Sequence, residues 1–572
     1  PRFSMAGGRT HAQTWQLDGA IVNNTALDWN QLSLNPSAES MQEFKAESSN
    51  YSAEFGNAGG GVITMTTRSG TNQFRGALYE YLRNDKLDTR TFFAAQKPQL
   101  RYNIFGASLG GPIRKNKTFF FVNYEGSRRR TPQVFSGTIV PHPPEVEGDF
   151  SARRDLTVLD PTTRTAFPGN KIPPSRFDPL GRAYARMYPA PNVAGNDITR
   201  MPAANYIASG ADGLRQDLTT VRIDYLLGSK DTLNWRLTNG QAWNTFAAIF
   251  PDPVTDARTK VQRHKHTNTV GTWVHTFGPS LVNEGRYTYG KRYFHAKYAG
   301  VESNKNKELG IVGVDPSGFA TVQATGLSGF GANGISGSEQ ERIQSPIMNQ
   351  EAIDNLTWMR GKHQVKTGFA YRYMGNGEDT RRLKGGKFTF SDRATNNGLA
   401  AMLLGWTTSA ELAVSDLLRT RMDYWGGYVQ DNWKLTANLT LNLGLRWEMT
   451  TPRWEMNNRQ SGFDSGAVNP ASGTPGVMTF AGINADKYAH DFDKNNLGPR
   501  FGFAYRASGR TVVRGGYGIA YADPYYSVTL QNLMNGFGLF GTFSSPDGGF
   551  TPAFLFRDGM PTVTREQLGP GF

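Results

Sequence analysis

The 572-residue sequence predicts an all-β chain that folds as an antiparallel transmembrane β-barrel of the outer-membrane type. Three observations lead to this prediction. Apolar and polar residues alternate with a period of two, the connections between strands alternate between short and long, and Gly, Tyr and Phe are abundant. No run of residues approaches the roughly eighteen consecutive apolar residues of a transmembrane helix. With 19% charged and 12% aromatic residues, the chain is also too apolar and too aromatic for disorder.

Residues 439–448 show the alternation most clearly. Leucines and one tryptophan occupy the odd positions, whereas Thr, Asn, Gly, Arg446 and Glu448 occupy the even ones, so one face is apolar and the other polar. One Arg or Lys on the lipid side at the bilayer midplane costs about 2 to 4 kcal/mol. Charged residues opposite the apolar rows are therefore expected to face the lumen. Five of them are predicted to do so: Arg222, Asp224, Arg446, Glu448 and Arg514.

Thirteen segments of this kind follow one another along the chain. They are residues 74–83, 101–112, 117–127, 217–227, 232–245, 263–277, 281–293, 348–359, 363–375, 421–434, 439–449, 497–506 and 511–522. The connections after the even-numbered segments are three or four residues long, and every other connection is much longer. Outer-membrane barrels sort their connections in this way, with tight periplasmic turns and large extracellular loops. The alternative is a soluble sandwich array or propeller, but the sequence shows no blade-length repeat.

The long connections are predicted to be extracellular loops. They are residues 84–100, 128–216, 246–262, 294–347, 376–420, 450–496 and 523–572. The second of them is rich in proline and is expected to form an ordered cap. Within it, Asp178 is placed to cap a short helix that has Pro179 at its first position, with an apolar face that includes Leu180 and Tyr184. That face is expected to pack on the loop rather than to bind a ligand.

The composition limits the partners and the chemistry. No cysteine is present, so no disulfide or thiolate metal site can form. The 62 Lys and Arg residues outnumber the 48 Asp and Glu residues, which gives a net charge of +14. These cations are scattered and often lie two residues from an acid, whereas a nucleic-acid binder gathers them in a patch. No nucleic-acid partner is therefore expected.

Three short patterns suggest chemistry, and a structural interpretation is favoured for each. Ser108 lies in a G-x-S-x-G match, but Gly-Pro follows it where a nucleophile elbow needs a helix. His264 and His266 share a strand face without a third ligand nearby. His490 and Asp493 could belong to a metal loop, yet they precede an ordinary strand. The sequence therefore predicts no enzyme, no cofactor and no metal site.

Residues 41–72 resemble the last part of the plug domain of TonB-dependent outer-membrane receptors. In that family a strand, a Tyr/Phe-Gly turn, a glycine pair and a final strand ending in Thr-Lys/Arg-x-Gly lead into the barrel. The matching residues here are Tyr51, Gly56, Gly60, Gly61, Thr67, Arg68 and Gly70. Further along the chain, several segments are similar to the Oar-like branch of the family: residues 74–85, 103–113, 117–126, 167–173, 354–363 and 428–433.

The resemblance implies that residues 1–72 form the C-terminal part of a plug and residues 73–572 a partial barrel, with about 13 of about 22 strands. A TonB box and a carboxypeptidase-regulatory-like domain would precede Pro1. The implied function is a receptor that imports a solute across the outer membrane of a Gram-negative bacterium, driven by the TonB–ExbB–ExbD system. Outer-membrane lipid surrounds such a barrel, and the unknown solute would be of carbohydrate or peptide class. The alternative is a structural or adhesive surface protein that displays large loops.

Two further expectations concern side chains of the plug and the loops. Four plug residues are expected to meet the lumen-facing charges of the barrel: Glu43, Lys45, Glu47 and Arg68. Four aromatic residues of the outer loops could stack on a sugar or a peptide: Trp454, Tyr525, Tyr526 and Phe540.

Overall fold

A computed structural model gives the fold of the chain. It describes residues 5, 12–23, 35–48, 51–89, 99–195, 197–200, 203–256, 258–331, 341–381, 383–415, 417–488, 491–522, 536–565, 567–569 and 571. Within these residues, no helix is long and apolar enough to cross a membrane.

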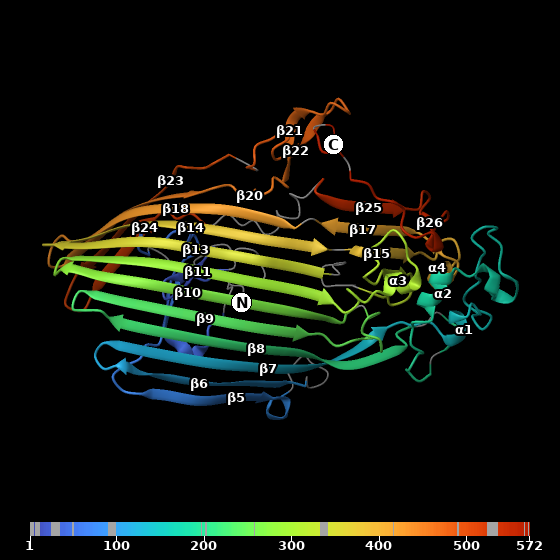
Figure 1. Cartoon of the computed structure of the whole chain (residues 1–572), viewed down its shortest axis with the longest axis horizontal. Helices are drawn as coiled ribbons and strands as arrows, with labels where there is room; N and C mark the ends of the chain where they lie inside the picture. The colour runs from blue at the N-terminus through green and yellow to red at the C-terminus, as the bar shows by residue number, and fades with distance from the viewer. Residues whose placement is uncertain are drawn as a thin grey trace.

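One large, twisted antiparallel sheet forms the body of the molecule (Figure 1). Its strands, in chain order, are β5 (Arg75–Asn84), β6 (Arg101–Arg114), β7 (Thr118–Thr138), β8 (Tyr206–Leu226), β9 (Asp231–Thr245), β10 (Lys260–Gly278), β11 (Leu281–Tyr298), β13 (Glu341–Arg360), β14 (His363–Arg381), β18 (Leu418–Lys434), β19 (Leu439–Thr450), β23 (Asn496–Arg506) and β24 (Val512–Gly518). Each pairs with the next in this order, and the two-residue β20 (Trp454–Glu455) pairs with β18. The all-β, antiparallel barrel prediction is confirmed, and each of the thirteen expected segments forms one of these strands.

The strands run further than expected at the long-loop end. β7 continues to Thr138 and β8 begins at Tyr206, so the connection expected at 128–216 spans only residues 139–205. The expected connections 294–347 and 376–420 are shortened in the same way by β13 and β14. Above the membrane both faces of a strand meet water, so the apolar and polar alternation fades while the backbone ladder continues. Alternation therefore marked the membrane-spanning part of each strand and missed its extension.

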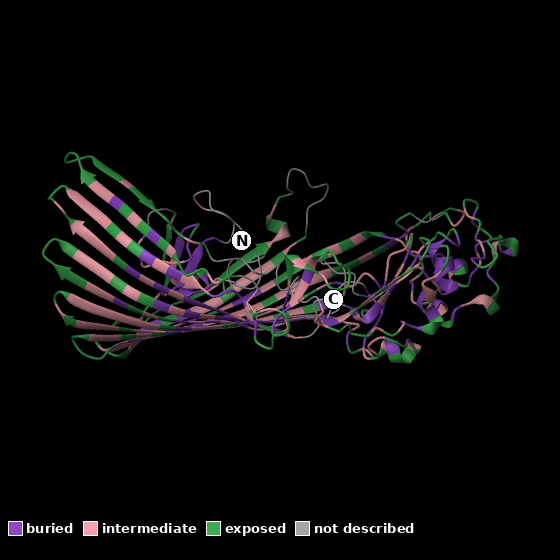
Figure 2. Ribbon diagram, turned by 90° about the horizontal axis from the view of Figure 1, so that it is seen from above, coloured by how far each residue is buried: buried purple, intermediate pink, exposed green. Residues whose placement is uncertain are grey.

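Exposed and less exposed residues alternate along the strands of the large sheet (Figure 2), so its two faces differ in exposure. On β19, Leu443 and Leu445 are 40% and 45% exposed, whereas Arg446 and Glu448, which follow them on the opposite face, are each only 4% exposed. Other large apolar side chains of the sheet, such as Trp235, are exposed in the same way as these two leucines. Because lipid covers the outer face of a membrane barrel, this face needs no further protein layer.

A small plug sheet lies against the other, polar face of the large sheet (Figures 1 and 2). It contains β1 (Thr14–Leu17), β2 (Ala20–Ile21), β3 (Met41–Glu47) and β4 (Val62–Thr67), in the order β2-β1-β4-β3, with β1 and β4 parallel. The single turn η1 (Ala38–Ser40) leads into β3. Trp15, Leu17, Ile63 and Met65 form its small core. β3, in contrast, leaves Phe44 62% exposed.

The long connections fold into a cap with its own apolar core. Its helices are α1 (Pro143–Val146), α2 (Pro179–Ala185), α3 (Lys305–Leu309) and α4 (Gly398–Leu403), and its single turns are η3 (Pro168–Asn170), η4 (Pro174–Arg176) and η5 (Phe556–Asp558). Its strands are β12 (Thr321–Ala324), β15 (Leu383–Phe390), β17 (Ser409–Ser415) and β25 (Gly538–Ser544), which form one sheet, and the pair β16 (Trp406–Thr407) and β26 (Phe554–Leu555). β21 (Ser461–Val468) and β22 (Pro475–Phe480) form a separate hairpin, and the turn η2 (Asp85–Leu87) follows β5.

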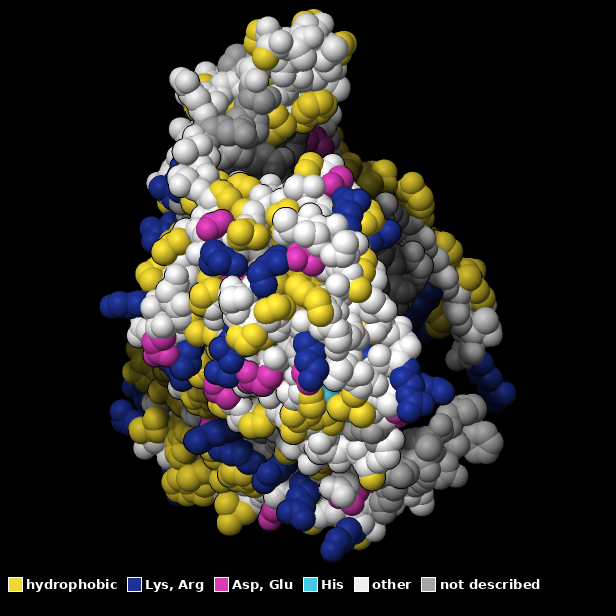
Figure 3. Space-filling view, turned by 90° about the vertical axis from the view of Figure 1, so that its right-hand side faces the viewer, with side chains coloured by type: hydrophobic (Ala, Val, Ile, Leu, Met, Phe, Trp, Pro, Cys, Tyr) yellow, Lys and Arg dark blue, Asp and Glu magenta, His cyan; other side chains and the backbone are white. Residues whose placement is uncertain are grey.

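The helix expected in the cap is present. Asp178 accepts hydrogen bonds from the backbone N–H groups of Leu180 and Gly181, both at 3.0 Å, and Pro179 opens α2. Tyr184, fully buried, stacks on Phe319 with ring centroids 5.3 Å apart. The apolar face of α2 thus packs into the core of the cap, as expected. Charges of both signs are interleaved on the surface at this end of the molecule (Figure 3).

Candidate functional site

The contact between the plug and the barrel wall is an extensive polar site outside the cap. In the described part of the chain, arginines from five separate barrel strands reach backbone carbonyl groups of the plug. They are Arg222 of β8, Arg236 of β9, Arg286 of β11, Arg446 of β19 and Arg500 of β23. All five lie on the polar face of the large sheet, because each occupies the position opposite its strand's apolar row.

The first cluster surrounds the end of plug strand β4. Arg222 donates to the Thr67 carbonyl at 2.9 Å and pairs with Asp224, its Nη2 lying 2.9 Å from Oδ1. Asp224 in turn accepts a hydrogen bond from the Ser69 hydroxyl at 2.5 Å. The Asp18 carboxylate, in the turn between β1 and β2, accepts from the backbone N–H and the hydroxyl of Thr67 at 2.9 and 2.8 Å. One arginine and two carboxylates thus fix the segment that leads from plug to barrel.

Arg236 extends this cluster into the plug sheet. Its side chain is almost fully buried, and its Nε lies 3.0 Å from Asp18 Oδ2. Its Nη2 donates to the Leu17 carbonyl at 3.0 Å and to Asn268 Oδ1 at 2.7 Å. Because a buried cation needs both a counter-charge and hydrogen-bond acceptors, plug and barrel each supply part of what Arg236 requires.

The second cluster holds the turn between β3 and β4. Arg446 donates to the Ala53 carbonyl at 3.0 Å and forms an ion pair with Glu448, with Nε 2.6 Å from Oε1. The same Glu448 oxygen accepts from the backbone N–H of Asn57 at 3.0 Å and from the Tyr424 hydroxyl at 3.0 Å. The two ionic side chains are only 4% and 5% exposed. Their charges are compensated by each other and by the plug backbone.

Two further barrel residues bind the same turn. Arg500 donates to the Phe55 carbonyl at 2.9 Å and also to the carbonyls of Tyr51 and Ser52, while its guanidinium lies 4.6 Å from the Tyr51 ring centroid. Gln430 accepts from the Ala53 N–H at 2.7 Å. Main-chain groups of the plug are the partners in nearly all these contacts.

The plug-motif residues lie where the backbone is most crowded. The Tyr51 hydroxyl donates to the Ala58 carbonyl, and Gly61 adopts a φ of +107°, a conformation that side chains rarely tolerate. A Cβ on Gly56 would overlap Glu448 and Arg446. The remaining motif residues make close contacts too: Gly60 against Ala12, Thr67 with Asp18 and Arg222, Arg68 with Glu39, and Gly70 against the backbone of Gly111 and Phe120.

Four of the five barrel residues singled out from the sequence meet the plug, and they fall into two pairs: Arg222 with Asp224, and Arg446 with Glu448. Arg514 does not meet it. It lies on the same sheet face, opposite Ala504, but on the outermost strand β24, where it is exposed and has no plug contact among the described residues.

The plug side chains expected to meet these charges do not do so. Lys45 pairs with Glu47 at 3.1 Å within β3, Glu43 is exposed, and Arg68 lies 3.8 Å from Glu39. That expectation is wrong, because β3 lies on the open side of the plug sheet. The barrel arginines instead reach the carbonyl groups that the turns leave unpaired.

Several contact residues were missed in the sequence. Arg500 occupies an inward position of the segment 497–506, and Arg236 lies beside outward-facing Trp235, so alternation alone could have identified both. Asp18 lies in a tight turn with a φ of +50°, outside the quoted motif, and no periodic pattern identifies it.

The other residues considered for catalysis or metal binding have structural roles where the structure describes them. Ser108 lies inside strand β6, and His264 lies on β10 with its ring 4.8 Å from that of Phe294. The described part of the chain contains no group of three or more His, Asp or Glu placed to hold a metal ion. His490, Tyr525 and Tyr526 lie outside the described residues.

The fold and this site define a class of protein, an outer-membrane β-barrel wall with a plug bound to its inner face. The comparisons agree. The chain belongs to the family described as outer membrane beta barrel domain, whose model matches residues 66–571. It is an outer-membrane protein of a Gram-negative bacterium.

Two relatives extend the comparison beyond this family. The chain is 24% identical, over 492 residues, to the TonB-dependent transporter Oar of Myxococcus xanthus, in a match that covers 78% of this chain and 43% of that protein. Its fold resembles the outer membrane transporter YddB from Escherichia coli, with a TM-score of 0.57, 12% identity and coverage of 95% of this chain and 57% of the other. The chain thus spans about half the length of these proteins, and the Oar-like resemblance is confirmed.

Proposed function

We propose that this chain is part of a TonB-dependent transporter that imports a solute across the outer membrane. The observation that carries the proposal is the plug itself, bound inside the barrel wall by arginines that hold its backbone. The similarity to a protein named as a TonB-dependent transporter supports it. The TonB–ExbB–ExbD system is the energy source that this similarity implies.

The plug contacts suit an element that must be held and then moved. Each charge-assisted hydrogen bond contributes about 1.5–3 kcal/mol, and the bonds are spread over several strands rather than concentrated in one apolar interface. A pulling force applied through the plug can therefore break them in succession. Residues 1–72 act as the plug, and residues 73–572 supply the wall and the loops.

In the proposed orientation the short turns face the periplasm and the cap faces the exterior. The solute is of carbohydrate or peptide class and meets the cap first. Trp454 and Phe540 lie in this region, Phe540 being 51% exposed, and offer aromatic surface for such a ligand. We assign no catalytic role to any residue.

The alternative function is adhesive or structural display of the loops, and the feature that supports it is the cap. The cap has a core of its own, with Phe388 and Phe556 fully buried and their ring centroids 4.7 Å apart. A rigid surface module of this kind could also bind another cell or a matrix. It gives no reason, however, for a plug on the inner face of the barrel.

Uptake measurements in the native host separate the two functions. Cells with and without the full-length gene would be given fluorescein-labelled oligopeptide and oligosaccharide pools, with or without a protonophore. The proposal predicts that one pool accumulates only when both the gene and the proton gradient are present. Uptake that is independent of the gene, together with reduced cell attachment in the deletion strain, would favour the adhesive function.

A further inference from the structure

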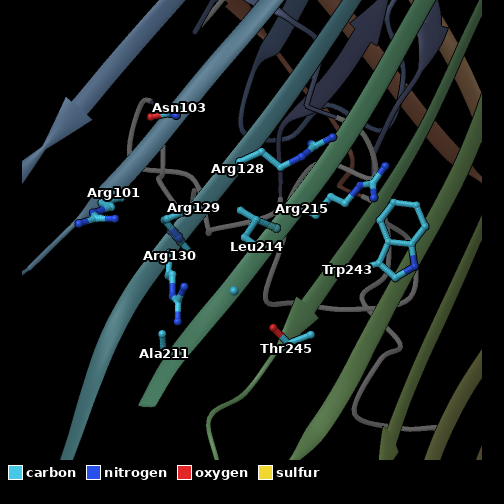
Figure 4. Close-up of a pocket in the computed structure, with 11 residues that line it drawn as sticks. Arg101, Asn103, Arg128, Arg129, Arg130, Ala211, Leu214, Arg215, Trp243 and Thr245 are labelled. Atoms are coloured by element: carbon cyan, nitrogen blue, oxygen red, sulfur yellow. The ribbon is translucent and has the colours of Figure 1, made fainter. Parts of the chain in front are cut away.

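A shallow groove of about 630 Å³ lies across β6, β7, β8 and β9 at the end of the sheet that carries the cap (Figure 4). Arginines dominate its lining. They are Arg101, Arg128, Arg129, Arg130 and Arg215, joined by Trp243. Among the described residues, none of these side chains contacts the plug.

The strand register places this groove on the outer face of the sheet. Arg215 lies seven residues from Arg222, whose side chain binds the plug, and an odd separation reverses the face. Arg128 is three residues from Glu125, which accepts a hydrogen bond from Ser37 of the plug segment. The ladders between these strands are regular over this stretch. Of the groove arginines, only Arg129 belongs to the inner face.

The groove brings like charges directly opposite one another. Arg101 pairs in register with Arg130, and Arg128 with Arg215. Asp217 compensates the second pair, lying 2.6 Å from Arg128 and 3.1 Å from Arg215. Like charges at opposed positions destabilise a sheet unless an anion lies between them. Arg101 and Arg130 have no carboxylate partner in the part of the chain that the structure describes.

An apolar groove lies directly below on the same outer face. Its lining includes Leu78, Leu109, Val122 and Tyr124, and its volume is about 610 Å³. Val122 precedes Arg128 by six residues along β7, which is about 20 Å of extended strand. The outer face thus changes from apolar to cationic over about the thickness of one lipid leaflet with its headgroups, which is about 20 Å.

We propose that these two grooves together bind a phosphorylated glycolipid of the outer leaflet. Its acyl chains would lie on the apolar groove, and a headgroup phosphate would lie between Arg101 and Arg130. Guanidinium groups bind phosphate oxygens in a bidentate fashion, and the phosphate removes the repulsion within the pair. A soluble phosphate would use only the upper groove. The proposal rests on the orientation given under Proposed function, because the cap end must face the exterior.

Binding to purified full-length protein tests this directly. The probes are fluorescent bis-phosphorylated lipid A, the same lipid after enzymatic dephosphorylation, and inorganic phosphate. The test variant is R101Q/R130Q, and R101K/R130K keeps the charge. The control variant is R114Q/R510Q, which removes two exposed arginines at the opposite, short-turn end of the sheet. Heat-modifiable gel mobility checks that each variant is folded.

R101Q/R130Q should bind lipid A at least about tenfold more weakly than the natural protein, since two charge-assisted contacts are lost. R114Q/R510Q should bind normally, and R101K/R130K, which keeps the charge but not the bidentate geometry, should have an affinity between those of the natural protein and R101Q/R130Q. Dephosphorylated lipid A should bind the natural protein as weakly as lipid A binds the test variant. Equal binding of both lipids, or full affinity in R101Q/R130Q, would overturn the proposal. If inorganic phosphate competes with lipid A at micromolar concentration, the claim that the bound phosphate belongs to a lipid is wrong. Lipid binding needs no proton gradient, so its failure is distinguishable from a failure of transport.

Discussion

The barrel wall recognises the plug largely through its backbone, and plug side chains such as Asp18 and Ser69 add to these contacts. Arg446 and Arg500 each bind two or more plug carbonyl groups, and Gln430 binds an amide N–H. A turn leaves such groups without strand partners, and inside a barrel they must find acceptors and donors in the wall. The substitutions that matter most are therefore on the barrel, or at plug glycines where the backbone comes close.

Replacing Arg446 with alanine should detach the β3–β4 turn of the plug. The substitution leaves Glu448 buried without its counter-ion, which typically costs about 3–5 kcal/mol. In full-length protein, hydrogen exchange of residues 53–58 should accelerate. R514A is the matched control, because Arg514 lies on the same sheet face but is exposed and touches no described plug residue. Equal exchange in the two variants would contradict this assignment.

Gly56→Ala should have a similar local effect by a steric route. The added Cβ would overlap the Arg446–Glu448 pair and the Tyr424 hydroxyl. Overpacking of this kind costs about 1–3 kcal/mol. Gly137→Ala is the control, since no atom of the described residues lies within 4 Å of the Cβ position there. Denaturant-dependent release of the plug, followed by limited proteolysis, measures the difference, and identical midpoints would refute the predicted crowding.

At the scale of the elements, alternation identified all thirteen membrane strands but not the cap. Periodicity reports a boundary between lipid and a polar lumen, and residues 139–205 cross no such boundary. Within these residues, the sequence predicted only helix α2, from its N-cap residue Asp178 and from Pro179, because helix capping depends on neighbouring residues alone. The sheet of β12, β15, β17 and β25 joins distant segments, and no local pattern predicts such pairing.

Asp178→Ala should loosen the cap. The fully buried carboxylate caps α2 and also accepts from the Arg557 backbone N–H at 3.0 Å, so it joins α2 to η5. Loss of an N-cap costs about 1–2 kcal/mol, and the unpaired Arg557 groups add to this. D197A is the control, because Asp197 is an exposed acid of the same connection. Trypsin cleavage within 143–188 should increase in D178A alone, and equal cleavage in both variants would contradict the assigned role.

The cap should also lose stability in strong acid. A hydrogen bond from Lys171 lowers the pKa of Asp149 to about 2, and paired bonds from Arg176 lower the pKa of Asp160. A carboxyl whose folded pKa is depressed stabilises the fold above its unfolded pKa of about 4, and that contribution disappears as the pH falls through the folded pKa. Hydrogen exchange in 149–176, corrected for intrinsic rates, should therefore increase between pH 4 and pH 2.

The double variant D149N/D160N provides the matched control for the acid response. Its amide side chains cannot titrate, so its exchange should be faster than that of the natural protein at pH 5 and should change less on acidification. A natural protein and a variant with the same pH profile would show that these carboxyls do not stabilise the cap.

At the scale of the whole molecule, the sequence predicted the barrel and the plug more fully than it predicted their contact. The inward faces of β8 and β19 could be inferred because a charge cannot face lipid. The plug residues that pair with these charges could not be inferred, since Asp18 lies more than two hundred residues from Arg222 in the sequence. Lys45, which was expected to contact the barrel, pairs with Glu47 on its own strand instead. The polarity of a residue predicts which face of its strand it occupies. Its contact partner can be predicted only when the relative positions of the barrel sheet and the plug sheet are known.

The central claim, that the plug lies inside the barrel wall in this register, is tested most directly by one cross-link. Ala58 of the plug forms an antiparallel bridge with Ala522 beyond β24, and bridged Cα atoms lie within the range of a disulfide. The chain has no cysteine of its own, so A58C/A522C in the full-length protein should oxidise completely in isolated outer membranes. A58C/Y521C, shifted by one residue, should not. Failure of the first pair, or equal oxidation of both, would contradict the placement of the plug.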